Sequence, residues 1–108
     1  MSFSYTPTTE GNGPVVEKGM KIAAHYTGKF TDGNVFDSSV QRGTPLEFVV
    51  GVGQVIKGWD EGFVGRKVGD KGVLVCPPDY AYGAAGAGGV IPPNATLHFE
   101  IEVVAIKS

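Results

Sequence analysis

The residues of this chain that could act as nucleophiles, general bases or metal ligands are few and scattered. There is one cysteine, Cys76, and there are two histidines, His25 and His98. These three cannot build a standard zinc site, which takes four nitrogen or sulfur ligands at short spacings. Both histidines fall on the polar faces of predicted strands, so we expect them to be solvated, and we expect Cys76 to be a small buried residue. A nucleophile-and-base enzyme is therefore poorly supported, and no metal or cofactor is expected.

Motifs for nucleotides, nucleic acids and membranes are incomplete or missing. The segment Gly51–Ile56 begins like a dinucleotide-binding loop, but isoleucine stands where the third glycine belongs and no βαβ pattern surrounds it. Nine lysines and arginines are spread along the chain and the net charge is −2, so no nucleic acid partner is expected. The apolar runs are far shorter than the roughly 18 residues that a membrane-spanning helix needs, so no membrane partner is expected.

Two segments alternate between apolar and polar residues with the period of two that is typical of half-buried strands. In Met20–Phe30 the even positions are mostly apolar or aromatic, and in Leu97–Val103 the odd positions are apolar. The residues Thr31–Asn34 follow the first segment and predict a hairpin turn. Four shorter strands are expected at Phe3–Pro7, Val35–Ser38, Leu46–Val50 and Gly72–Cys76.

One segment, Ile56–Val64, departs from this β pattern. Its apolar residues fall at positions i, i+3, i+7 and i+8, which form one stripe of a short helix. Gly58, Gly62 and Gly65 make it a poor helix on propensity alone, so packing against the apolar face of the sheet must hold it. A helix that covers one curved antiparallel sheet is a two-layer α+β domain. The stripe consists of Ile56, Trp59, Phe63 and Val64.

The composition agrees with a single small domain over residues 1–108. Glycine supplies 17 residues and valine 15, whereas a helical bundle would be rich in leucine, alanine, glutamate and lysine. Leucine, isoleucine, valine and phenylalanine together supply 29 residues, which is too many for a disordered chain. A single cysteine forms no intramolecular disulfide, and Met1–Tyr5 reads as the start of a cytosolic protein. We therefore expect a cytoplasmic protein, and we expect it to be a monomer.

The segment Pro77–Pro93 is a long, glycine-rich loop that carries Tyr80 and Tyr82. Loops of this length are usually functional or disordered, and the aromatic residues and paired prolines favour an ordered one. The predicted helix and this loop concentrate aromatic and aliphatic side chains with few charges. Such a composition is typical of an apolar pocket with a small number of polar groups.

Five short motifs occur in order along the chain. They are HYTG at His25–Gly28, FDSS at Phe36–Ser39, VIKGW at Val55–Trp59, YAYG at Tyr80–Gly83 and IPPNATL at Ile91–Leu97. Together they resemble the FKBP-type peptidyl-prolyl cis-trans isomerases, the immunophilins that bind tacrolimus and rapamycin. The resemblance covers about residues 19–106. It implies a five- to six-stranded antiparallel sheet wrapped around one short helix, and an enzyme that assists folding by rotating X–Pro bonds.

The resemblance also implies a role for each matching residue. Trp59 resembles the indole on which the substrate proline ring sits, and the backbone N–H of Ile56 resembles a donor to a substrate carbonyl. Tyr82 resembles a hydroxyl donor from the long loop. Asp37 resembles the single acidic group of the pocket, with Arg42 as its partner. The walls and rim are then formed by Tyr26, Phe36, Phe99, Val55, Val90 and Ile91.

Three features depart from the family pattern. Leu46 stands where close relatives often carry phenylalanine, which makes one wall thinner, and Gln54 stands where some members carry an acid. The loop tip Ala84–Gly89 has no large side chain. These departures bear on drug affinity and on the residue preferred before proline, since the residues implied in isomerisation are present.

A dry aromatic pocket suits this reaction because no covalent bond has to break. The peptide bond resists rotation with a barrier of about 18–20 kcal/mol, which comes from amide resonance. The twisted transition state carries less charge on its carbonyl than the planar amide, so apolar surroundings oppose it less than water does. Two roles are open for Asp37. In one it is a structural carboxylate paired with Arg42 or Tyr26, and in the other its electric field acts on the carbonyl of the bound substrate. A shared role is favoured over acid–base catalysis.

Three classes of function are compatible with these residues. The leading one is a single-domain isomerase that acts on proline-containing peptides and proteins and binds macrolide immunosuppressants, with a phosphatase or kinase as a possible drug-dependent partner. The second is a binding module that captures proline-containing partners with little catalysis. The third is a structural domain whose glycine-rich loop only bridges partners.

Overall fold

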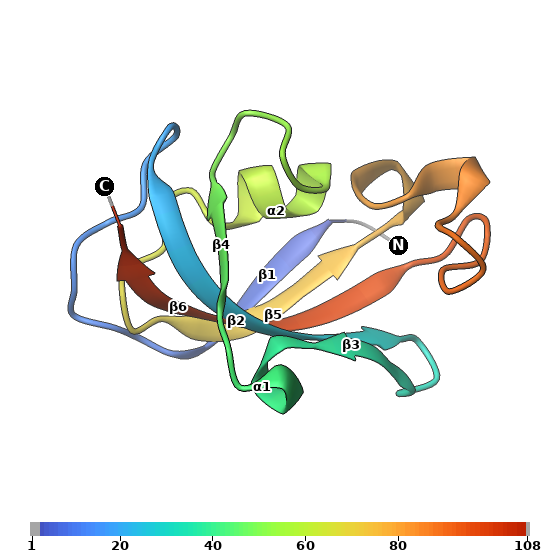
Figure 1. The fold of residues 1–108 in the computed structure, drawn as a ribbon, viewed down its shortest axis with the longest axis horizontal. Coiled ribbons are helices and arrows are strands. Elements are labelled where there is room, and N and C mark those ends of the chain that lie inside the picture. Colours follow the sequence, from blue (N-terminus) through green and yellow to red (C-terminus); the bar gives the residue numbers. More distant parts are fainter. Residues whose placement is uncertain (1–2, 108) are drawn as a thin grey trace.

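The computed structural model describes residues 3–107 and places six strands in one curved antiparallel sheet (Figure 1). The strand order is β1-β5-β6-β2-β3, and β4 pairs with a second stretch of β2. This architecture confirms the α+β fold expected from the sequence, with a short helix against one face of the sheet. The strands are β1 (Ser4–Thr9), β2 (Lys21–Phe30), β3 (Val35–Ser38), β4 (Leu46–Val49), β5 (Lys71–Cys76) and β6 (Leu97–Ile106).

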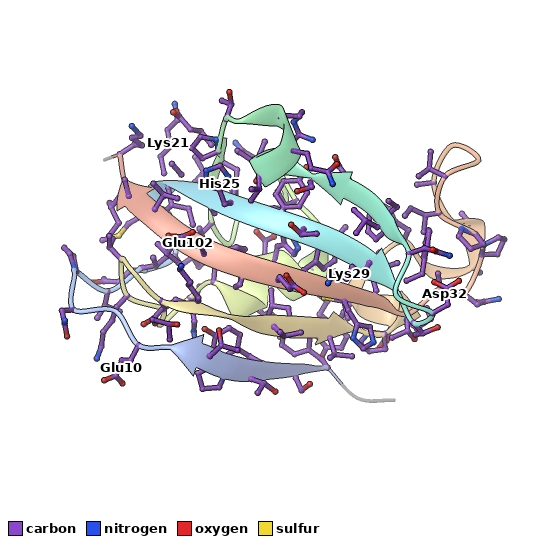
Figure 2. All side chains as sticks on the ribbon, turned by 90° about the horizontal axis from the view of Figure 1, so that it is seen from below. Glu10, Lys21, His25, Lys29, Asp32 and Glu102 are labelled. Carbon is purple, nitrogen blue, oxygen red and sulfur yellow. The ribbon has the colours of Figure 1, made fainter. Side chains whose placement is uncertain are left out.

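The two strands with the clearest alternation form the centre of the sheet. β2 and β6 pair from Ile22 opposite Ile106 to Phe30 opposite Leu97, so β6 runs past the predicted end at Val103. The even residues of β2 face α2 and are mostly buried, whereas the polar odd residues lie on the opposite, outer face. Figure 2 shows His25 and Lys29 on that outer face, away from the helix. The inner face therefore carries the core, as the period of two predicts.

The helix α2 (Lys57–Gly62) lies across the inner face of the sheet and is shorter than predicted (Figure 1). Trp59 and Phe63 are buried as expected, but Val64 follows the end of the helix and is 38% exposed. Its glycines have a packing role. A Cβ atom on Gly58 would overlap the sulfur of Cys76, and one on Gly62 would lie 2.5 Å from a methyl group of Leu74. The glycines weaken the isolated helix but allow it to approach β5 closely.

The sequence prediction missed one short α-helix, α1 (Ser39–Arg42), and two 3₁₀ turns. The hydroxyl of Ser38 accepts a hydrogen bond from the Gln41 N–H at 3.3 Å, and Gly43 ends the helix with a φ of 75°. A single helical turn has no apolar stripe, so periodicity does not reveal it. The 3₁₀ turns η1 (Pro78–Tyr80) and η2 (Gly83–Ala85) lie in the long loop, which was predicted to lack regular structure.

The expectation for the cysteine is confirmed, and that for the histidines is wrong. Cys76 is fully buried, whereas both histidines are half-buried on the outer face instead of solvated. The Nδ1 atom of His25 lies 2.9 Å from the hydroxyl of Ser39. The Nε2 atom of His98 is buried and has no hydrogen-bond partner within residues 3–107. Neighbouring strands and α1 crowd these positions, which a pattern read along one strand does not include.

Burial should make Cys76 chemically inert in the native protein. Burial raises the pKa of its thiol to about 12, so the thiolate that reacts with alkylating agents is not formed at mildly alkaline pH. We expect iodoacetamide to leave the folded protein unmodified and to label it fully in concentrated guanidinium chloride, as measured by intact mass. Equal labelling rates in the two states would show that the thiol is accessible.

Two kinds of feature are not found among residues 3–107. No helix there is long and apolar enough to cross a membrane. No group of three or more histidine, cysteine, aspartate or glutamate side chains in this range is placed to hold a metal ion.

Candidate functional site

A cavity of about 180 Å³ opens between α2, the inner face of the sheet and the two loops beside them. Ten of the thirteen residues predicted for the site line it. They come from β2, β3, β4, β6, α2 and two loops, so the fold itself brings these residues together. The lining residues are Tyr26, Phe36, Asp37, Leu46, Gln54, Val55, Ile56, Trp59, Tyr82 and Phe99.

Three predicted residues do not line this cavity. Arg42 lies next to it, where its guanidinium group bonds to Asp37 and Tyr26. Val90 and Ile91 instead line a separate, open cavity of about 860 Å³ between the long loop and the β2–β3 turn. Backbone hydrogen bonds between Ala87 and Ile91 fold this loop back on itself, which buries Ile91 in the core and exposes Val90. The loop side of the cavity is therefore formed by Tyr82.

Trp59 forms the floor of the cavity and is held by four other rings. Its ring centroid lies 4.9 Å from that of Tyr26 and 5.3 Å from that of Phe99, both in edge-to-face geometry. Phe48 and Phe63 lie beneath it, each with a centroid distance of 5.5 Å. Edge-to-face pairs of this kind stabilise a fixed ring orientation. The floor of the cavity is thus one surface of the hydrophobic core.

Phe36 forms a wall of the cavity and depends on a glycine behind it. Its ring packs edge-to-face on Phe99 at 5.8 Å and contacts Phe30 at 4.9 Å. A Cβ atom on Gly28 would lie 2.5–3.0 Å from three atoms of the Phe36 ring. The glycine of the HYTG motif therefore leaves the space in which this aromatic wall sits.

Asp37, Tyr26 and Arg42 form a closed hydrogen-bonded network. The Tyr26 hydroxyl donates to Asp37 Oδ2 at 2.6 Å, and Arg42 donates to Asp37 Oδ1 at 2.5 Å and to the Tyr26 hydroxyl oxygen at 2.9 Å. The predicted pairing of Asp37 with Arg42 is present. The Asp37 and Arg42 side chains are 44% and 49% exposed, so this pair contributes little to stability and serves mainly to orient the groups.

The charge state of the site follows from these contacts. Partial burial pushes the pKa of Asp37 upward, but hydrogen bonds from Tyr26 and Arg42 outweigh it and hold the pKa below 3.8. Burial, reinforced by the Asp37 carboxylate, raises the pKa of Tyr26 above 10.0. Burial and the charge of Asp37 also raise the pKa of Tyr82. At neutral pH the carboxylate is ionised and both phenols keep their protons.

The loop before α2 presents a backbone donor at the rim of the cavity. The Asp60 carboxylate accepts hydrogen bonds from the N–H groups of Gly51 and Gly53 at 2.8 and 2.9 Å, which fixes the loop. Gln54 uses its carbonyl oxygen to accept from the Val49 N–H at 3.0 Å. The carbonyl of Ile56 begins α2, but its N–H enters none of the hydrogen bonds found within residues 3–107. This N–H is free to bond a carbonyl placed in the cavity.

Tyr82 offers a second free donor from the opposite side. It lies between η1 and η2, is 42% exposed and lines the cavity. Its hydroxyl enters none of the hydrogen bonds found within residues 3–107. The cavity therefore combines an apolar floor and walls with two unused donors and one paired carboxylate. Such a site can hold an apolar ring and orient the carbonyl groups on either side of it.

Sequence reasoning missed two residues that hold the site in place. Asp60 fixes the loop that carries Ile56, and Ser39 bonds to the backbone of Tyr26. A signal for α1 is present, because Ser38 and Gln41 have the Ser-x-x-Gln spacing of a capping box and Gly43 follows. Asp60 bonds to loop residues that lie seven and nine positions before it in the sequence. These contacts lie in irregular structure, so no periodic sequence pattern predicts them.

Comparison with known proteins identifies the class. Residues 13–104 match the family described as FKBP-type peptidyl-prolyl cis-trans isomerase. The chain belongs to this family and is an isomerase of the FKBP type, an immunophilin. The six-stranded sheet and the short helix of this chain are shared with a solved FKBP.

Individual relatives match over nearly the whole chain. FK506-binding protein 1 of Dictyostelium discoideum is 51% identical over 99% of this chain and all of its own length. Peptidyl-prolyl cis-trans isomerase Fkbp12 of Drosophila melanogaster is 46% identical over the same shares of the two chains. The crystal structure of AtFKBP13 superposes with a TM-score of 0.90 at 43% identity, covering 96% of this chain and 92% of that one.

Proposed function

We propose that the cavity above Trp59 is where this isomerase rotates X–Pro bonds. The proline ring of the substrate packs on the indole, enclosed by Tyr26, Phe36 and Phe99. The Ile56 N–H and the Tyr82 hydroxyl bond the carbonyl groups of the substrate. The observation that carries this proposal is the convergence of an apolar, ring-lined cavity with two donors that have no partner within residues 3–107.

The proposed site lowers the barrier by favouring the twisted amide. Rotation removes the amide resonance and reduces the charge on the carbonyl. Moving the twisted form out of water therefore costs less free energy than moving the planar form. Packing of the ring on Trp59 holds one end of the bond while the residue before proline turns. Each tenfold acceleration needs about 1.4 kcal/mol of such differential stabilisation. The paired Asp37 carboxylate then acts through its field and by orienting Tyr26.

A protease-coupled assay on a short X–Pro peptide tests the proposal directly. We expect the wild-type protein to accelerate isomerisation and tacrolimus to inhibit it by occupying the cavity. Tyr82→Phe removes one hydroxyl donor and should lower kcat/KM about fivefold, the value of one ordinary hydrogen bond of about 1 kcal/mol. An unchanged kcat/KM and unchanged drug affinity in Tyr82→Phe would remove the hydroxyl from the mechanism.

A binding module remains the alternative use of the same cavity. It would give peptide affinity in a titration without faster exchange between cis and trans peptide signals in NMR. The family membership favours the enzyme, and the exchange experiment separates the two on a single sample.

The ligand and partner proposals follow from the same site. We infer that macrolides such as tacrolimus and rapamycin occupy the cavity, with Leu46, Gln54 and Val55 at its rim. Val90 is 58% exposed on the loop beside it, where it would contact a phosphatase or kinase recognising the drug complex. A monomeric state is proposed as well, and a cytoplasmic location is proposed because the one cysteine, Cys76, is free and the fold needs no disulfide. Analytical ultracentrifugation and cell fractionation test these two points.

A further inference from the structure

Within residues 3–107, one stretch of the central strand β2 has no strand partner on one side. On that side β3 pairs with β2 at Thr27 and beyond, and β4 pairs with it only as far as Ala24. His25 and Tyr26 lie in the gap between them. On the other side both residues pair normally with Glu102 and Ile101 of β6. The backbone of Tyr26, a wall residue of the proposed site, therefore needs other hydrogen-bond partners at this edge.

The hydroxyl of Ser39 fills this gap. Ser39 is fully buried, and its Oγ accepts a hydrogen bond from the Tyr26 N–H at 2.7 Å. The same hydroxyl donates to the Tyr26 carbonyl oxygen at 3.3 Å. One side chain thus supplies both bonds that a neighbouring strand would have supplied. Buried backbone groups are costly without such partners.

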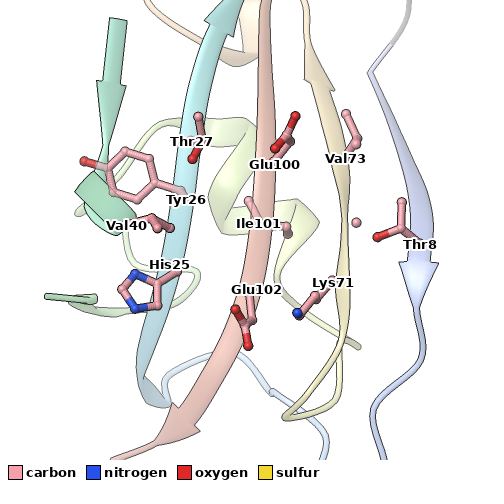
Figure 3. A pocket seen from close by; sticks show the side chains of 11 residues that line it. Thr8, His25, Tyr26, Thr27, Val40, Lys71, Val73, Glu100, Ile101 and Glu102 are labelled. Carbon is pink, nitrogen blue, oxygen red and sulfur yellow. The ribbon is translucent and has the colours of Figure 1, made fainter. Parts of the chain in front are cut away.

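His25 completes the bonding of this hydroxyl from the outer face of the sheet. Its Nδ1 atom lies 2.9 Å from Ser39 Oγ. The His25 ring lines an outer cavity of about 350 Å³. Figure 3 shows Val40 of α1 beside this ring and α2 behind the sheet. A hydroxyl has one proton and two lone pairs. Ser39 therefore serves both groups of Tyr26 and His25 at once when the histidine donates from Nδ1.

The same serine is the first residue of α1, whose last residue is Arg42. Arg42 bonds to the hydroxyl oxygen of Tyr26 and to Asp37. Tyr26 is thus held at two points: its backbone by Ser39 and its phenol by the network that α1 carries. A shift of α1 relative to β2 would move both.

We propose that Ser39 is a positioning residue for isomerisation, whose hydroxyl fixes the Tyr26 ring and the Arg42–Asp37 pair at the mouth of the cavity. This inference rests on the proposed function, because these groups matter for the rate only if the cavity holds the X–Pro bond.

The chain offers a matched control in the adjacent serine. Ser38 is also buried at the start of α1, but its hydroxyl bonds to the Gln41 N–H and Thr27 Oγ1 and to no group of Tyr26 or His25. Ser39→Ala and Ser38→Ala each remove one buried hydroxyl from the same helix start. We expect Ser39→Ala to lower kcat/KM about tenfold, mainly through kcat, because small misplacements at a reacting centre are costly. Ser38→Ala should change kcat/KM less than twofold while losing a comparable amount of stability.

A second readout reports on position and not on stability. The titration of the Asp37 carboxyl, followed by NMR, should move up toward its ordinary value in Ser39→Ala, because Tyr26 and Arg42 no longer hold it. It should stay in place in Ser38→Ala. If Ser39→Ala does not fold, His25→Ala removes one partner of Ser39 from the outer face. That variant should shift both readouts in the same direction, by less.

The wild-type assay and Tyr26→Phe together separate failure of this inference from failure of the proposed function. If Tyr26→Phe lowers kcat/KM but Ser39→Ala and Ser38→Ala behave alike in both readouts, Ser39 has only a structural role and the inference is overturned. If the wild-type protein does not accelerate isomerisation, the proposed function fails. If it does but Tyr26→Phe leaves kcat/KM unchanged, the hydroxyl network of Tyr26 does not affect the rate, and the inference alone is overturned. A selective effect of Ser39→Ala in the presence of an active Tyr26 supports it.

Discussion

Replacing Trp59 by alanine is expected to lower the free energy of unfolding by about 3–5 kcal/mol, the usual cost of removing a large buried aromatic side chain. The indole is 5% exposed and contacts the rings of Tyr26, Phe48, Phe63 and Phe99. Its loss leaves an empty space between α2 and the sheet. Isomerase activity should fall below detection, because the floor of the proposed site is gone. Urea unfolding and the X–Pro peptide assay measure the two effects.

Trp59→Phe is the control for this prediction. It keeps an aromatic ring between the helix and the sheet and removes the indole N–H, which is buried and has no hydrogen-bond partner within residues 3–107. We expect it to be clearly more stable than Trp59→Ala, because less contact area is lost and a smaller empty space is left. A cost below about 1 kcal/mol for Trp59→Ala, set against the range for such substitutions, would show that the helix is not held by this residue.

Gly28→Ala should damage the site from behind, although Gly28 does not line the cavity. The added methyl group would lie 2.5–3.0 Å from three atoms of the Phe36 ring, so the ring has to move. Overpacking of this kind costs about 1–3 kcal/mol. Because Phe36 is also a wall of the cavity, we expect kcat/KM to fall about tenfold or more, in line with the sensitivity of reactions to misplaced groups. Stability and activity are measured as for Trp59.

A double-mutant cycle with Phe36→Ala tests the cause. Phe36→Ala removes the ring that the new methyl group would meet, so Gly28→Ala should cost much less stability in that background. Equal costs in the two backgrounds would mean that the clash with Phe36 is not the reason for the loss.

The sequence predicted the sheet and most of the cavity because both depend on regular or family-wide patterns. The alternation in β2 and β6 follows from one buried face, and the apolar spacing of Trp59 and Phe63 follows from one helix face. Ten of the predicted site residues line the cavity, because the motifs indicate both where these residues lie in the sequence and which fold brings them together. This part of the site could thus be predicted from the sequence alone.

The remaining features depend on contacts between segments that no local pattern encodes. Val90 and Ile91 do not line the cavity, contrary to the prediction, because the loop folds back between Ala87 and Ile91. His25 is half-buried because the first residue of α1 packs against the gap between β3 and β4, and this packing involves three elements at once. The short helix itself was recoverable only from its capping residues, since one turn has no periodicity to read.

The free polar groups of the cavity also bear on which amides it admits. Besides the buried indole N–H of Trp59, the Ile56 N–H and the Tyr82 O–H have no partner within residues 3–107, whereas the Asp37 oxygens and the Gln54 carbonyl oxygen already accept hydrogen bonds. An X–Pro bond is a tertiary amide and brings carbonyl oxygens but no N–H. An ordinary secondary amide would bring an N–H that has to compete for acceptors already bonded to Tyr26, Arg42 or Val49, and a donor left unsatisfied costs about 1–3 kcal/mol. We therefore expect the proposed site to favour proline by the N–H that the imide nitrogen lacks as well as by the shape of its ring.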